Sequence, residues 1–123
     1  MQVFTARSSE TYDMAFLCTN LDKQIQENVT FGINSLGILI CDSTIDYKEV
    51  VALLSQKYTF KIYGCTALAF IHVGKAEDIS TSFMVITGDE DLVVSTALTQ
   101  PLNAQNSEDA VCAAYEKARE QLP

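Results

Sequence analysis

The stretch LGILICDSTIDYKEVVALLSQKYTFKIYGC, residues 36–65, decides the fold. Its first part, LGILIC at 36–41, is continuously apolar, which is typical of a strand in a parallel sheet that is covered on both faces. Residues 46–58 have apolar side chains at helical spacing: Tyr47, Val50, Val51, Leu54 and Tyr58. FKIYGC at 60–65 then returns to a strand pattern. The order predicts a βαβ unit with parallel strands and a right-handed crossover.

The flanking segments extend this unit in both directions. Residues 2–7 read as a short strand, and the segment after it has one apolar helical face: Met14, Leu17, Cys18, Leu21 and Ile25. Residues 68–73 are apolar and extended, and residues 80–98 read as two strands around the turn sequence GDED. Residues 107–121 read as a last helix with one apolar stripe: Val111, Ala114, Tyr115, Ala118 and Leu122. We therefore expect an α/β fold: a mixed sheet with a parallel βαβ core, an antiparallel hairpin and three helices.

Length and composition limit the class of protein. A chain of 123 residues, 48% hydrophobic, suits a single domain. Sixteen acidic residues against eight basic ones give a net charge of -8, which argues against nucleic acid or an anionic membrane as a partner. There is no apolar run of about 18 residues and no signal-peptide pattern. The four cysteines are scattered, which favours free thiols in the cytoplasm.

The candidate site follows from the parallel strands. In open α/β sheets, ligands bind beyond the carboxyl ends of such strands. Two loops share that edge, CDSTID at 41–46 and GCTA at 64–67. We therefore expect six residues to form a ligand-binding edge: Asp42, Ser43, Thr44, Gly64, Cys65 and Thr66.

Each of these residues also has a simpler structural interpretation. A reactive Cys65 needs a base or a cation beside it, yet the only histidine is His72 and neither loop has a lysine or arginine. A small, buried, inert thiol is therefore favoured. Gly64 serves a sharp turn or a close backbone approach. Asp42 binds a cation or a ligand amine, or it opens an Asx turn, and Asp46 caps the following helix.

The sequence predicts no cofactor, no metal and no catalytic residue. Phosphate-loop and dinucleotide patterns are absent. The acidic run at 89–91 lacks the spacing of a calcium loop, and His72 has no second ligand at a suitable distance along the chain. We expect a protein that is not an enzyme.

Residues 37–71, GILICDSTIDYKEVVALLSQKYTFKIYGCTALAFI, resemble the first part of FIST N-terminal domains. Those domains have an apolar strand, a short polar loop, a helix and a strand that ends in Gly-Cys-Ser/Thr. A strand pair similar to 82–98 and an Ala-rich helix similar to 107–121 follow in the family. The chain departs from the pattern at Ala69 and Phe70, which stand where the family has Gly and Glu.

The resemblance implies an intracellular sensory domain of bacterial signal transduction that binds a small, amino-acid-like ligand. It also implies that residues 1–123 are a single FIST-N-like domain, the N-terminal fragment of a longer protein, acting on a downstream signalling module or partner protein. Two other functions stay open at this point. One is a protein-interaction domain, including a possible homodimer; the other is a cysteine-dependent enzyme that uses Cys65.

Overall fold

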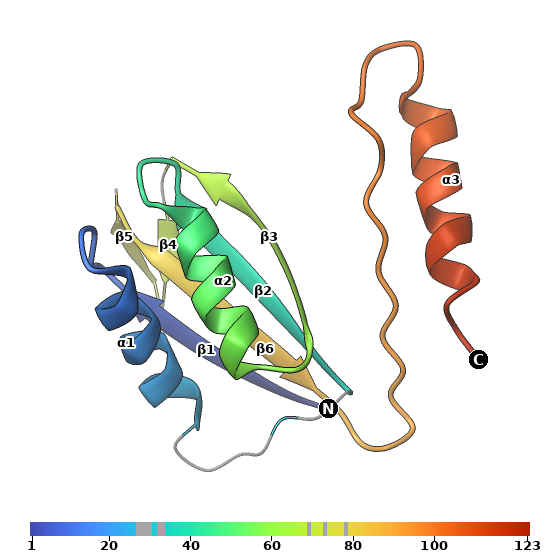
Figure 1. Cartoon of the computed structure of the whole chain (residues 1–123). Helices are drawn as coiled ribbons and strands as arrows, with labels where there is room; N and C mark the ends of the chain where they lie inside the picture. The colour runs from blue at the N-terminus through green and yellow to red at the C-terminus, as the bar shows by residue number, and fades with distance from the viewer. Residues whose placement is uncertain (27–30, 32–33, 69, 73, 78) are drawn as a thin grey trace. The chain divides into compact units, whose positions relative to one another are not determined.

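The computed structural model describes residues 1–123 except 27–30, 32–33, 69, 73 and 78, and for residues 26, 70–72 and 75–77 it describes the backbone (Figure 1). The chain divides into two compact units, Met1–Leu92 and Val93–Pro123. Within the described residues the fold is mixed α/β, with three helices and a four-stranded mixed sheet. This confirms the predicted fold class.

The sheet of the first unit has the strand order β1-β6-β2-β3. Its strands are β1 (Gln2–Ser8), β6 (Thr81–Thr87), β2 (Ser35–Asp42) and β3 (Lys61–Ala67). Strands β2 and β3 are parallel, as predicted, and β6 pairs antiparallel with both β1 and β2.

The antiparallel hairpin lies elsewhere than the sequence predicts. It consists of β4 (Phe70–His72) and β5 (Lys75–Glu77), joined at Gly74, whose φ of 75° favours glycine. The predicted hairpin around GDED is wrong, because the chain forms no strand after β6 in residues 88–98, all of which are described. Both edges of β6 are already paired with β1 and β2, so a following strand has no free edge of β6 to join.

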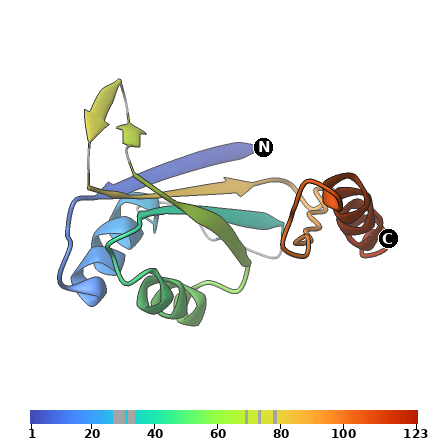
Figure 2. The same ribbon diagram turned by 90° about the horizontal axis from the view of Figure 1, so that it is seen from above.

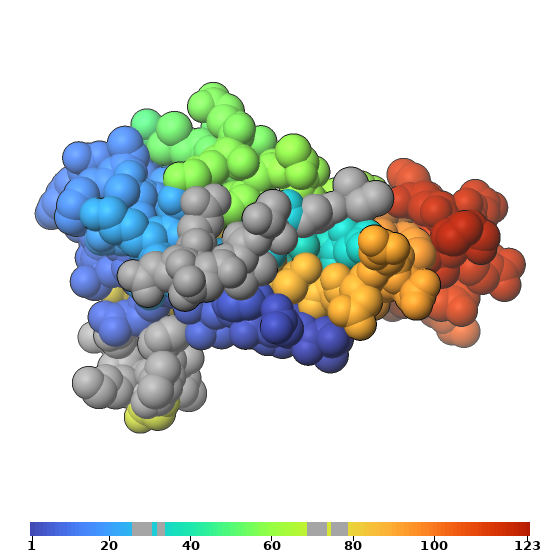
Figure 3. Space-filling view, turned by 90° about the horizontal axis from the view of Figure 1, so that it is seen from below, coloured from blue at the N-terminus to red at the C-terminus, as the bar shows by residue number. Residues whose placement is uncertain are grey.

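Helices α1 (Met14–Gln26) and α2 (Tyr47–Lys57) lie on the same face of the sheet (Figure 2). They also pack against each other, and their atoms adjoin in the space-filling view (Figure 3). The predicted apolar face of α1 is buried throughout, which confirms it: Met14, Leu17, Cys18, Leu21 and Ile25. On α2 the prediction is half right. Val50, Leu54 and Tyr58 are buried, whereas Tyr47 and Val51 are 43% and 38% exposed.

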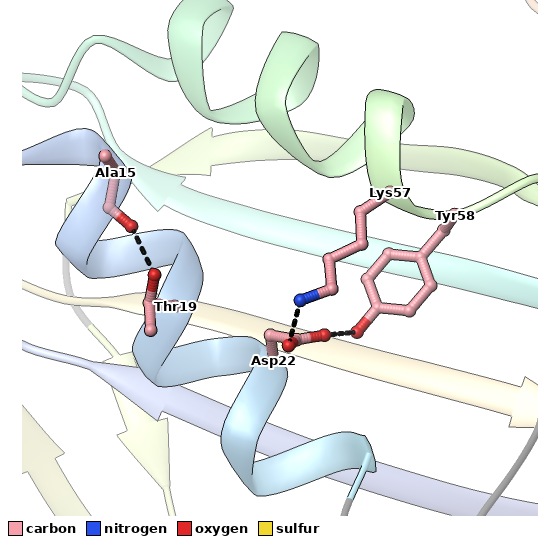
Figure 4. Close-up of polar contacts among 5 residues, drawn as sticks. All are labelled: Ala15, Thr19, Asp22, Lys57 and Tyr58. Atoms are coloured by element: carbon pink, nitrogen blue, oxygen red, sulfur yellow. Dashed lines mark hydrogen bonds and ion pairs between the residues drawn. The ribbon is translucent and has the colours of Figure 1, made fainter.

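A polar contact ties the two helices together beside the core (Figure 4). The Asp22 carboxylate of α1 accepts a hydrogen bond from the Tyr58 hydroxyl at 2.5 Å and forms an ion pair with Lys57. Asp22 and Tyr58 are buried, and Lys57 is about half exposed. Solvent screens the ion pair, so the hydrogen bond from Tyr58 is the stronger link.

Replacing Tyr58 with phenylalanine is expected to lower the free energy of unfolding by about 1.5–3 kcal/mol, the usual range for a hydrogen bond to a charged group. The ring keeps its packing, and the hydroxyl that donates to Asp22 is lost. Urea unfolding followed by circular dichroism measures the change. Tyr12→Phe is the matched control, because Tyr12 is 95% exposed. Equal unfolding midpoints for the two variants would contradict the assignment.

The second unit contains α3 (Ser107–Arg119) and an extended segment. The Ser95 hydroxyl donates to the carbonyl of Ala118 at 2.7 Å, and the Gln121 amide donates to the carbonyl of Thr96 at 3.3 Å. Of the predicted apolar stripe of this helix, Val111, Tyr115 and Leu122 are 53%, 64% and 43% exposed. One extended segment is too narrow to bury a whole helical face.

None of the helices in the described part of the chain has the length and apolar character needed to cross a membrane.

Candidate functional site

The predicted loop at 41–46 follows the end of β2, whereas the prediction of a loop at 64–67 is wrong, because these residues continue strand β3 (Lys61–Ala67) and pair with β2. Cys41 lies opposite Thr66, and Asp42 lies opposite Ala67. Strands β2 and β3 therefore end side by side, and the residues that follow β2 are neighbours of the end of β3. The arrangement is the one that the βαβ pattern predicts.

The first loop is a closed turn built on Asp42. One carboxylate oxygen of Asp42 accepts hydrogen bonds from the Thr44 hydroxyl at 2.5 Å and from the Thr44 amide at 2.8 Å. The backbone amide of Asp42 donates to the carbonyl of Ser80 at 3.0 Å. Asp42 is buried, while Ser43 and Thr44 are exposed. The Asx-turn interpretation of Asp42 therefore accounts for one of its oxygens.

The helix that follows starts at a side-chain cap. The carboxylate of Asp46 accepts from the backbone amide of Glu49 at 3.2 Å. This confirms the predicted cap. It also fixes the direction of α2 relative to the end of β2, from which only the short loop separates it.

The Thr44 hydroxyl, followed by the Thr44 amide, holds the pKa of Asp42 below its ordinary value. The folded pKa lies below the unfolded one, so this contribution to stability is present above about pH 4 and is lost as the pH falls through the folded pKa. Thr44→Val removes the hydroxyl and is expected to raise the pKa of Asp42 toward its ordinary value, measured by carboxyl-carbon NMR titration. Ser43→Ala is the control and leaves that pKa unchanged. A low pKa retained in Thr44→Val would show that the hydroxyl has no part in it.

Sequence reasoning missed three buried polar residues at the same end of the sheet: Ser8, Ser80 and Thr81. The Ser80 hydroxyl donates to the carbonyl of Ser8 at 3.2 Å, and the Ser80 carbonyl accepts the amide of Asp42. The polar run around residue 80 was visible in the sequence. Its burial depends on β6 lying between β1 and β2, which no local pattern reveals.

Strand β3, which contains residues 64–66, lines a pocket of about 270 Å³ between α2 and the strands β2 and β3. Residues 62–66 of β3 form one side, Tyr47 and Val51 of α2 form another, and Leu39 and Cys41 of β2 complete it. Of the six predicted residues, Gly64, Cys65 and Thr66 line the pocket. Asp42, Ser43 and Thr44 do not; they form the turn at the neighbouring strand end.

Gly64 is required by a close backbone approach. A Cβ at this position would lie 1.6 Å from the carbonyl oxygen of Leu39, far inside van der Waals contact. Of the two interpretations that the sequence left open for Gly64, the structure supports close approach over a sharp turn. Gly64 lies within β3, opposite Leu39 of β2.

Cys65 is exposed, so the prediction of a buried thiol at this position is wrong. It lies opposite Ile40, on the face of the sheet that points away from the helices. Strand β3 is also an edge strand of the sheet. Cys18 and Cys41 are the buried thiols. Burial raises the pKa of Cys18 to about 11 and also raises the pKa of Cys41, so both stay protonated at neutral pH.

These differences predict how the four thiols react. At pH 8 the exposed Cys65 and Cys112 are expected to react with a chromogenic disulfide reagent, while Cys18 and Cys41 react only after unfolding in guanidinium. Cys65→Ala should lower by one the number of thiols that react in the folded protein. Rapid reaction of a third native thiol would contradict the burial. A reaction rate at Cys65 far above that at Cys112 would support the hypothesis of a cysteine-dependent enzyme.

No group of three or more histidine, cysteine or acidic residues is placed to hold a metal ion in the part of the chain that the structure describes. Comparison with family models, with curated proteins and with solved structures finds no match to this chain.

Proposed function

We propose that this chain is a cytoplasmic sensory module that binds a small, amino-acid-like ligand in the pocket between α2 and β3, as part of bacterial signal transduction. One observation carries the proposal. The Gly-Cys-Thr sequence through which the chain resembles FIST N-terminal domains, residues 64–66, lines a pocket of about 270 Å³. The same residues belong to the carboxyl-terminal half of the parallel strand β3, and ligands of open α/β sheets bind beyond the ends of such strands.

The chemistry of the pocket favours binding over catalysis. The described residues that line it contribute hydroxyl and thiol groups, with no carboxylate, imidazole or amine. A thiol or hydroxyl nucleophile needs an activating base or cation within hydrogen-bond reach, and the described lining supplies neither. We therefore propose no catalytic role for Cys65.

A thermal-shift panel of the amino acids and small metabolites tests the proposal, with the whole chain as the sample. A ligand at 100 times its Kd stabilises the folded state by about 2.7 kcal/mol, which raises the Tm of a domain of this size by several degrees. Stabilisation that saturates with one class of compound is the expected result. A panel in which no compound moves the Tm would count against a ligand-binding module.

The other face of the sheet favours a protein-interaction domain as the second candidate. Helices α1 and α2 lie on the opposite side (Figure 2). On this face Val3 is 52% exposed and Met84 36% exposed, and they lie beside the half-buried Ile86 and Ile38. Exposed apolar surface of this kind is typical of contact with a partner, including a second copy of the chain. Static light scattering tests the homodimer: a monomeric mass at high protein concentration would contradict it.

A further inference from the structure

We propose that the pocket between α2 and β3 takes the uncharged, apolar body of its ligand, either an aromatic ring system or a branched aliphatic side chain. The inference rests on the proposed function and narrows it. It separates apolar amino-acid-like ligands from the charged ones, which the same proposed function would otherwise include.

The walls of the pocket carry the first part of the argument. Leu39, Val51 and Ile62 contribute aliphatic carbon from three different elements, and Tyr47 adds a ring. The described residues that line the pocket include no charged side chain. A charged group placed there would lose its water and gain no opposite charge, which costs several kcal/mol. An apolar group gains roughly 25 cal/mol for each Å² that it removes from water.

The backbone keeps this pocket open. Ile62, Gly64 and Thr66 lie at alternate positions of β3, opposite Gly37, Leu39 and Cys41 of β2. A Cβ at position 64 would meet the Leu39 carbonyl oxygen at 1.6 Å, so the close approach of the two backbones excludes any larger residue. The pocket wall therefore carries no side chain at this position.

Helix α2 lines the pocket with two partly exposed side chains. Tyr47 and Val51 are four residues apart and therefore lie on the same side of the helix. They are the two residues of α2 that line the pocket, and their exposed fractions are 43% and 38%, respectively. The rest of the chain therefore leaves part of the apolar surface of Tyr47 and Val51 exposed. The apolar body of a ligand in the pocket would cover this surface.

The size of the pocket limits the ligand. A volume of 270 Å³ exceeds the cavity of about 150 Å³ that holds one benzene ring in an engineered protein. It lies just below the range of about 300–1,000 Å³ that is usual for drug-sized ligands. One or two fused rings, or a branched side chain, match this space.

One end of the pocket is polar. Thr66 is exposed and carries the hydroxyl nearest to the end of β3, where the Asp42 turn lies on the neighbouring strand. A ligand with its body between Val51 and Ile62 would therefore present its polar group to Thr66. The pocket then recognises an amphipathic molecule with a single polar end.

NMR titration of the ¹⁵N-labelled whole chain tests this inference. The probes are indole, p-cresol, L-tryptophan and L-leucine on one side, and L-aspartate, L-lysine and L-serine on the other. We expect saturable shifts of the Val51, Ile62 and Thr66 amides with members of the first group. Val51→Phe fills the pocket and should weaken that binding at least tenfold. Ala52→Phe is the matched control, since it adds the same ring at the adjacent, exposed residue that does not line the pocket.

The outcomes separate the two proposals. Binding of charged or small polar amino acids at these amides, without the apolar probes, overturns the apolar class and leaves a ligand-binding module standing. Equal weakening by Val51→Phe and Ala52→Phe overturns the pocket as the site. A titration and a thermal-shift panel that both show no binding overturn both proposals. Val51 is at the surface, so the variants are expected to fold, and Val51→Leu gives a smaller change in the same direction.

Discussion

Replacing Gly64 with alanine is expected to lower the free energy of unfolding by about 3 kcal/mol or more, at or above the upper end of what an overpacked site usually costs. The reason is that the new Cβ would lie 1.6 Å from the Leu39 carbonyl oxygen and 2.6 Å from its carbonyl carbon. These are backbone atoms, so no side-chain rotation relieves the contact. Strand β3 has to move away from β2, and the ladder of hydrogen bonds between them weakens.

Urea unfolding of the whole chain measures this loss, with circular dichroism as the signal because the chain has no tryptophan. Cys65→Ala is the matched control, at the next residue of the same strand. Its side chain is exposed, so we expect a change within about 0.5 kcal/mol. Failure of Gly64→Ala to fold agrees with the expectation, whereas an unfolding midpoint equal to that of the parent chain would contradict it.

Replacing Phe83 with alanine is expected to lower the free energy of unfolding by about 3–5 kcal/mol, the range for a phenylalanine deleted from a core. Phe83 is 1% exposed and lies in the central strand β6. Its ring contacts that of Tyr58, with the centroids 5.9 Å apart. It also comes within 2.9 Å of where a Cβ of Gly37 would be, so the missing side chain of Gly37 makes room for it.

Met84→Ala is the control for this second variant. Met84 is the next residue of β6 and points to the opposite face of the sheet, where it is 36% exposed. We expect it to lose less than half of what Phe83→Ala loses. Similar losses at both positions would mean that the face opposite the helices is covered in solution, which would favour the protein-interaction candidate.

The sequence was informative wherever local pattern and burial coincide. The helical spacing of α1 led to the correct element, because period and hydrophobicity there report one buried face. The apolar run at 36–41 also led to a strand, but the expected cover on both faces is wrong: α1 and α2 lie on one face, and Leu36, Ile38 and Ile40 are only half-buried. The same reasoning failed at 92–98, an apolar stretch that becomes no strand. Strand formation needs a partner with a free edge, and that is a property of the assembled sheet.

The candidate site divides in the same way. The βαβ pattern predicted that the ends of β2 and β3 meet, because parallel strands joined by a helix have their carboxyl ends at one edge. The pattern did not reveal that the Asp42 turn is held by Thr44, or that the pocket opens beside Gly64 under Tyr47 and Val51. Those features depend on how closely two backbones approach and on the side on which α2 lies.

The sequence by itself determined the α/β class, the parallel pair β2–β3 and the edge of the sheet at which both strands end, with Asp42 opposite Ala67. Only the tertiary structure decided which of these residues line a cavity and which thiols are buried. It also decided why position 64 is glycine: the Leu39 carbonyl occupies the space of any Cβ there. Periodicity records which way a side chain points along one element, whereas a cavity and a close approach are set by the distance between two elements.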